Sequence, residues 1–368
     1  MRTTLRLLPA GLSLIAAIAG SHLQARGSVE SGWDAKAAAN YLDGRAEWWT
    51  TWPNAARDHG TYCMSCHTTL PYALARPELR DLLNEKGPSS AEEKILGNLL
   101  NRAHNWRDYE PWYPDQTRGI PKTSESRAIE AVMNALVLSR RDARAGKISE
   151  DLKTAFSVMW SLQMKTGPET GAWTWLNFKM EPWESPNSPY FGASMAALAV
   201  GSAPEGYGAS PEIAERVKAL ASYFQKQHDN VSLLNQLYGL WATGCVPSLL
   251  TAEQRKATID ATFALQQPDG GWSTVAIGSY KRMDGSESDV RTDGFATALA
   301  TLSLQAAGVP RSDARLSKGL EWLKRGQDRS GRWVAVSPNK DRDPQSEPSK
   351  FMSDAATAYA VLSLTYKN

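Results

Sequence analysis

The chain of 368 residues alternates two kinds of helical segment, and this alternation limits its fold more than any other feature. Segments of one kind are amphipathic and charged, and N-cap residues open several of them, at Ser149, Ser210, Thr251 and Ser312-Asp313. Segments of the other kind consist of small and apolar residues with few Lys or Glu. Helices that are apolar nearly all round must be buried on nearly all sides. The apolar segments are residues 60–75, 126–139, 191–201, 233–245, 294–307 and 355–364.

The two kinds recur at an interval of about 40 to 60 residues, which is typical of an array of helical hairpins. Counting along the chain gives about six of each kind, enough for a closed double ring. A ring with charged helices outside and apolar helices inside satisfies both patterns. We therefore predict an all-α fold, an (α/α)6 toroid of alternating inner and outer helices, as a single domain over residues 26–368. Residues 33–77 are expected to form one of its helical hairpins.

Three of the charged helices end in a Gln that is followed by a turn containing Gly and Trp. These endings are Gln163 with Gly171 and Trp173, Gln267 with Gly270 and Trp272, and Gln327 with Gly331 and Trp333. Joined to small-residue helices such as residues 293–298, the turns resemble the repeats of prenyltransferases and squalene–hopene cyclases. The resemblance covers roughly residues 120–368 and implies a toroid with a central cavity. It also implies that Gln267 and Trp272 brace neighbouring outer helices.

The catalytic motifs of the families that carry these repeats have no match in this chain. Class II terpenoid cyclases protonate an alkene with the middle acid of a D-x-D-D motif, and the nearest candidates here are Asp289 and Asp293. Arg291 between them favours the ionised carboxylates, which is the wrong state for a strong acid. Both lie just before an expected inner helix, where capping explains them, so they are weak catalytic candidates. The diphosphate motif D-D-x-x-D and the zinc ligands of prenyltransferases have no counterparts either.

Cys63-Met64-Ser65-Cys66-His67 is a C-x-x-C-H motif, the attachment pattern of a c-type haem. Two thiols three residues apart on a helical turn face the same way and can form thioethers to both vinyl groups of one porphyrin. His67 would then be the axial ligand of the iron. Three alternatives remain: a disulfide or dithiol pair, half of a zinc site whose other half is missing, and buried structural thiols. Cys245 is expected to be an inert buried thiol.

The helix count places the haem motif on an inner helix of the ring and not in a separate cytochrome domain. Pro71 lacks the N–H that would bond the carbonyl of His67, so the motif helix is expected to kink or stop there. The single covalent haem would then lie near one mouth of the ring. His59 and Met352 are the weak candidates for the sixth iron ligand, and an open sixth position is the alternative.

The N-terminus has the pattern of a bacterial secretory signal. A basic start precedes an apolar run over residues 7–19, which is too short to span a bilayer. Small residues follow, so we expect a signal peptide over residues 1–25, with cleavage after Ala25 or, alternatively, after Ala19. This predicts a periplasmic or secreted protein with no membrane span in the mature chain. The formal net charge of +2 gives no indication of nucleic-acid binding.

These patterns lead to three hypotheses about function. The first is an exported c-type haem protein that transfers electrons or oxidises or reduces an organic ligand, with a redox partner or a small hydrophobic ligand. The second is a cyclase or lyase that uses cavity acids such as Asp293, with Cys63 and Cys66 joined in a disulfide. The third is a non-enzymatic haem sensor or binding protein.

Overall fold

The computed structural model describes residues 32–367, and every structural statement below concerns that range. The expected signal peptide lies outside the described residues. Residues 32–367 belong to one compact unit. All regular elements among residues 32–367 are helices, joined by loops that contain three isolated β-bridges. Within the same range no helix is both long enough and apolar enough to cross a bilayer.

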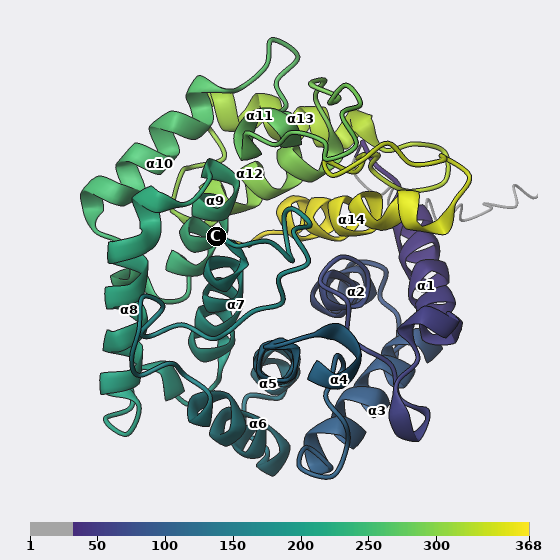
Figure 1. Ribbon diagram of the computed structural model, residues 1–368. Coiled ribbons are helices and arrows are strands. Elements are labelled where there is room, and N and C mark those ends of the chain that lie inside the picture. Colours follow the sequence, from purple (N-terminus) through teal and green to yellow (C-terminus); the bar gives the residue numbers. More distant parts are fainter. Residues whose placement is uncertain (1–31, 368) are drawn as a thin grey trace, which may run out of the picture. The chain divides into compact units, whose positions relative to one another are not determined.

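Six helices form the inner ring, each packed against the next, with the last packed against the first (Figure 1). Most of their side chains are buried, as the small-residue pattern predicts, and the C-terminal ends of the first two are partly exposed. The inner helices are α2 (Thr69–Leu82), α5 (Lys122–Ala145), α7 (Ser188–Ser202), α9 (Leu233–Thr243), α12 (Gly294–Ala306) and α14 (Phe351–Leu364).

Six amphipathic helices alternate with these along the chain and cover the ring from outside. They are α1 (Ala35–Thr51), α3 (Ser90–His104), α6 (Glu150–Ser161), α8 (Ala214–Gln227), α10 (Ala252–Ala264) and α13 (Ala314–Gly326). The predicted (α/α)6 toroid is therefore confirmed. Two short helices, α4 (Asp115–Arg118) and α11 (Thr274–Gly278), lie in connecting loops. Short 3-10 turns occur at Pro53–Ala55, Asp58–Gly60, Tyr207–Ala209, His228–Asn230, Pro247–Leu249 and Glu347–Lys350.

Three of the four predicted caps of outer helices are confirmed. The side chains of Ser149, Thr251 and Asp313 accept backbone N–H bonds at the starts of α6, α10 and α13. The prediction at Ser210 is wrong. A turn intervenes there, and α8 begins only at Ala214, after Ile213, without a side-chain cap.

Glutamine side chains join successive outer helices at three places. The Nε2 of Gln163 donates to the carbonyls of Gly171 and Arg216, the latter on α8. The Nε2 of Gln266 donates in the same way to Gly270 and to Arg315 on α13. The prediction that Gln267 has this role is wrong by one residue, because the Gln267 side chain reaches only the nearby Leu265 carbonyl. The third brace, from Gln327, runs to Gly331 and to Asp34 beside α1.

The glycines and tryptophans of the same turns pack between those helices. Each indole N–H donates to a carbonyl on the preceding outer helix: Trp173 to Met159, Trp272 to Thr262 and Trp333 to Leu323. Gly171, Gly270 and Gly331 have φ of +97°, +98° and +91°. A Cβ on any of them would lie 2.2–2.8 Å from a backbone oxygen of the next outer helix. Only glycine satisfies both the positive φ and the close approach.

Candidate functional site

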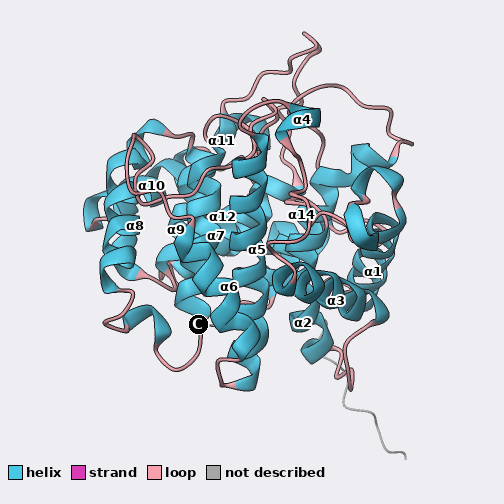
Figure 2. Ribbon diagram, turned by 60° about the horizontal axis from the view of Figure 1, so that its bottom comes forward, coloured by secondary structure: helices cyan, strands magenta, loops and turns pink. Residues whose placement is uncertain are grey.

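A cavity of about 700 Å³ opens at the mouth of the ring formed by the N-terminal ends of the inner helices. The long connecting loops that carry α4 and α11 lie at this end, uppermost in Figure 2. The walls of the cavity come from the loop before α2, the loop before α7 and the segment that leads into α14. A volume of this size falls within the range of small-molecule and cofactor sites, roughly 300–1,000 Å³.

The C-x-x-C-H motif lies in this wall, in the loop and turn directly before α2. The prediction of a helix through residues 60–75 is therefore wrong for the motif itself. Pro71 falls in the first turn of α2, where a backbone N–H has no helical partner, so it starts the helix and does not end it. Residues before the motif bind its backbone. The Cys63 N–H donates to the Ala55 carbonyl at 3.0 Å, and the Trp49 indole N–H donates to the Cys63 carbonyl at 2.8 Å.

Both motif thiols are free, buried and part of the cavity wall. Burial raises the pKa of Cys63 and raises that of Cys66 well above its usual value. Reactive thiol pairs have lowered pKa values, so this environment does not favour a dithiol redox function. Cys245 is also free but lines a separate cavity at the other end of the inner helices.

His67 presents one ring nitrogen for coordination. Its Nδ1 lies 2.8 Å from the Thr68 hydroxyl, and that hydroxyl donates its hydrogen to Asp354 Oδ2 at 2.7 Å. The Thr68 oxygen must therefore accept from Nδ1–H, which leaves Nε2 unprotonated. Burial lowers the pKa of His67 to about 3. The imidazole is neutral near pH 7, the form that binds metals.

Aromatic rings surround this histidine. The Phe351 ring stacks on it with centroids 3.9 Å apart, Trp49 meets it edge-on at 5.1 Å, and Trp183 lies 5.9 Å away. Trp52 is a further part of the cavity wall. Flat apolar surfaces of this kind suit a large planar ligand.

Four charged side chains also line the cavity, those of Glu181, Glu184, Arg118 and Arg342. The Glu184 carboxyl lies in a tight turn before α7, and burial raises its pKa to about 7, against the opposing effect of Arg57. Arg118 and Arg342 come from the loop before α5 and from the segment before α14. Within residues 32–367 neither of these two guanidinium groups forms an ion pair.

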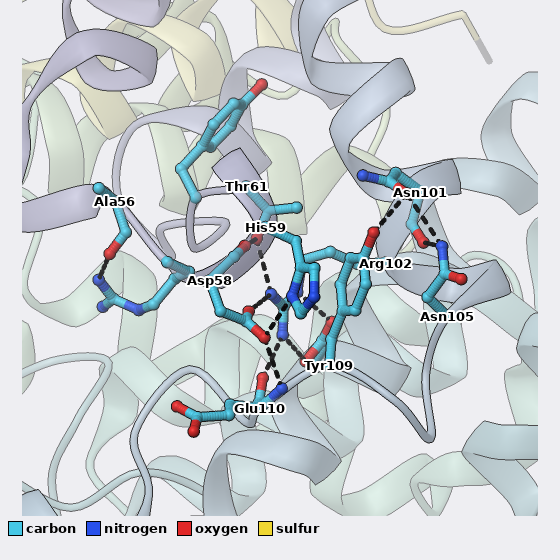
Figure 3. A network of polar contacts seen from close by, with 12 residues as sticks. Ala56, Asp58, His59, Thr61, Asn101, Arg102, Asn105, Tyr109 and Glu110 are labelled. Atoms are coloured by element: carbon cyan, nitrogen blue, oxygen red, sulfur yellow. Dashed lines mark hydrogen bonds and ion pairs between the residues drawn. The ribbon is translucent and has the colours of Figure 1, made fainter.

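The two sixth-ligand candidates occupy different places. His59 is at the surface with 58% of its side chain exposed; its Nδ1 lies 2.9 Å from Asp58 Oδ2. Its ring stacks on Tyr109 at 4.3 Å beside the Arg102 network (Figure 3). Met352, in contrast, is buried in the cavity wall. Met64 and Met180 line the same cavity and were missed, since loop methionines carry no periodic signal.

The two weak catalytic candidates are not part of the cavity wall. Asp289 forms an ion pair with Arg291, 2.6 Å between Oδ2 and Nη2. Asp293 caps α12 by accepting from the N–H groups of residues 295 and 296, and it takes two further bonds from Thr274. Burial raises the pKa of Asp293 to about 6. Its bonds agree with the capping interpretation.

A zinc site has no support in the donor geometry. Across residues 32–367, no cluster of three or more His, Cys, Asp or Glu side chains is arranged to hold a metal ion. Cys63, Cys66 and His67 share one cavity but do not converge on a single point as zinc ligands do.

Comparison with known proteins gives a partial match. Residues 217–352 match the family described as squalene-hopene cyclase C-terminal domain. The squalene–hopene cyclase of Zymomonas mobilis subsp. mobilis is 28% identical over 134 residues, 32% of this chain and 19% of the relative. A probable squalene–hopene cyclase of Sinorhizobium fredii is 30% identical over 135 residues, 33% of this chain and 21% of that protein. The chain has a terpene cyclase-like toroid fold.

The toroid extends beyond the matched segment. A solved structure titled as a polysaccharide lyase superposes with a TM-score of 0.52 at 13% identity, covering 90% of this chain and 98% of that one. At this identity the likeness concerns the fold alone. The curated relatives are matched over about a fifth of their own length. Because the family match begins at residue 217, it includes neither the Cys63–His67 motif nor Glu184.

Proposed function

We propose that this toroid is a c-type haem protein, with one haem attached covalently to Cys63 and Cys66 in the mouth cavity. Its role would be electron transfer or the haem-dependent oxidoreduction of an organic ligand. The observation that carries the proposal is that both free thiols and the His67 imidazole line one cavity of about 700 Å³. The proposal includes export, since haem is joined to such motifs outside the bacterial cytoplasm.

The residues present fit a haem in three respects. The two thiols are free, the His67 Nε2 is unprotonated, and the surrounding surface is largely aromatic. A bound haem would supply one-electron chemistry at its iron, at a potential set by axial ligation, burial and hydrogen bonding. His67 would hold the proximal side, while Phe351 and Trp49 fix its ring orientation and exclude water. Met352 or an open position would complete the distal side.

The charged groups in the cavity favour a reaction over simple electron carriage. Glu184 has a pKa near working pH, as suits a group that gives or takes a proton. Arg118 and Arg342 offer cationic donors to an anionic or polar ligand. A simple electron carrier or a non-enzymatic haem sensor does not require a cavity carboxyl that titrates near neutral pH. Turnover of a reducible or oxidisable organic compound by the loaded protein separates the oxidoreductase from both.

Intact mass of protein made in a strain with c-type maturation tests the attachment. The mature wild-type chain should carry the mass of one haem, and Cys63→Ser with Cys66→Ser should carry none. Cys245→Ser is the matched control, because Cys245 lines the other cavity, and it should keep the haem. An unmodified mass for the wild-type chain would refute the proposal.

One observation favours a second candidate, a cofactor-independent lyase or cyclase. Glu184 is a titrating carboxyl in a cavity of the same fold that squalene–hopene cyclases and a polysaccharide lyase adopt. In such an enzyme Glu184, the cavity carboxyl whose pKa burial raises to about 7, would be the acid–base group, and Asp293 and Asp289 do not line the cavity. Activity that persists in the Cys63→Ser, Cys66→Ser variant and is lost in Glu184→Gln would establish this candidate in place of the haem protein.

A further inference from the structure

Asp354 lies in the first turn of α14, fully buried, and links this helix to two other parts of the chain. Its Oδ1 accepts from the Tyr41 hydroxyl and from Arg45 Nε, both at 2.8 Å. Its Oδ2 accepts from the Thr68 hydroxyl at 2.7 Å. Asp354 does not cap α14, because the N-cap position of this helix is occupied by Lys350. These side-chain hydrogen bonds therefore join Asp354 to residues outside its own helix.

The donors and acceptors available fix the direction of each hydrogen bond in the network from Asp354 to His67. Arg45 has only donors, and both the Tyr41 and Thr68 hydroxyls point their hydrogens at carboxylate oxygens. Thr68 has no second hydrogen for His67, so it accepts from Nδ1–H at 2.8 Å. A buried carboxylate is thus connected, through one hydroxyl, to the far side of the imidazole whose Nε2 is free.

The surroundings hold this arrangement in place. Arg45 pairs with Asp354 and also with Glu347, so the buried carboxylate is compensated. Thr68 is buried directly after the motif, and its backbone N–H donates to the Ser65 hydroxyl oxygen at 3.1 Å. Phe351, three residues before Asp354 on the same helix, stacks on the His67 ring. One turn of α14 therefore fixes both the tautomer and the plane of the imidazole.

We propose that Asp354, acting through Thr68, is a positioning residue that holds His67 as the Nδ1–H tautomer and raises the basicity of Nε2. Carboxylates placed behind metal-binding histidines have this effect on the ligand. On the proposed function, a more basic Nε2 donates more strongly to the haem iron, stabilises the ferric state and lowers the reduction potential. The statement about the tautomer does not depend on haem.

The first measurement uses the full chain without haem. Nitrogen-15 NMR of His67, assigned by loss of its signals in His67→Gln, should show a protonated Nδ1 and an unprotonated Nε2. Thr68→Val removes the hydroxyl and should abolish this preference, whereas Thr68→Ser retains the hydroxyl and should preserve it. Protonation of Nε2 in the wild-type chain, or an unchanged spectrum in Thr68→Val, would overturn the proposal.

The second measurement uses the haem-loaded chain. Thr68→Val and Asp354→Asn should raise the midpoint potential and lower the iron–imidazole stretching frequency of the ferrous protein, while Thr68→Ser should match the wild type. Asp293→Asn is the control, a half-buried acid at another inner-helix start that does not line the cavity, and it should change neither value. Equal potentials in Thr68→Val and wild type would contradict the proposal. Absence of haem from the wild-type chain would refute the proposed function, and the NMR result would still decide the role of Asp354.

Discussion

Gln327 and Asp34 exchange two hydrogen bonds across the junction of the last and first outer helices. The Gln327 Nε2 donates to the Asp34 carbonyl at 2.9 Å, and its Oε1 accepts from the Asp34 N–H at 2.7 Å. The two residues are 293 positions apart. This contact is the third of the glutamine braces and the one that joins the two ends of the described chain, so the ring is closed by side-chain bonds as well as by inner-helix packing.

We expect Gln327→Ala to lower the free energy of unfolding by about 1 kcal/mol, because it removes the hydrogen bonds of this side chain to the Asp34 and Gly331 backbone at a partly exposed junction. Chemical denaturation of the full chain measures this. Gln267→Ala is the matched control, since that side chain joins no neighbouring helix, and it should cost less than about 0.5 kcal/mol. Equal losses in the two variants would show that the brace does not stabilise the ring.

Gly171 should not tolerate a side chain. Gly171→Ala places a Cβ 2.2 Å from the Ala219 carbonyl oxygen on α8 at a φ of +97°. Gly146→Ala has the positive φ alone, at +71°, with nothing within 4 Å, and should cost about 1–2 kcal/mol. Gly171→Ala should cost clearly more, measured by the same denaturation. A cost no greater than that of Gly146→Ala would contradict the close approach of this turn to α8.

Glu184 should make the free energy of unfolding depend on pH. Its folded pKa of about 7 is above its unfolded value, so the folded state binds more protons and the free energy of unfolding falls as pH rises from about 4.5 to 7. From the lower to the upper end of that window, we expect the free energy of unfolding of Glu184→Gln to rise relative to that of the wild type by on the order of 2 kcal/mol. Denaturation at pH 5 and pH 8 compares the two. If the difference in the free energy of unfolding between wild type and Glu184→Gln were the same at both pH values, the raised pKa of Glu184 would be contradicted.

The distal ligand can be tested by two substitutions in the haem-loaded chain. His59→Ala should leave the ferric and ferrous spectra unchanged, because the His59 ring lies at the surface on Tyr109. Met352→Ala should change the spectra or the rate of carbon monoxide binding, because Met352 is in the cavity wall. Spectral loss in His59→Ala with no effect in Met352→Ala would reverse this assignment.

The architecture was predictable because it depends on patterns that extend over whole helices. Charged and small-residue segments alternate with a regular interval, and this sufficed for the double ring. The roles of single residues and the exact ends of helices were harder to predict from the sequence. Gln266 and Gln267 are adjacent and identical, and only the fold shows which of them reaches α13. Pro71 indicates a helix boundary from sequence, but whether it starts or ends the helix depends on the loop before it.

The candidate site was predictable only where a motif marks it. Cys63, Cys66 and His67 are recognisable from spacing, whereas Glu184 lies in a loop whose path alone brings it to the cavity. The role of Asp354 was hidden for the same reason. Its partners Tyr41 and Thr68 are 313 and 286 residues away in the sequence, so no local pattern connects them to it.

The central claim is covalent haem in the mouth cavity. The most direct measurement is the pyridine haemochrome spectrum of the purified mature protein after extraction with acid and acetone. A haem joined through two thioethers should stay with the protein and give the c-type spectrum at one haem per chain. Colourless protein, or haem that passes entirely into the acetone, would contradict the account.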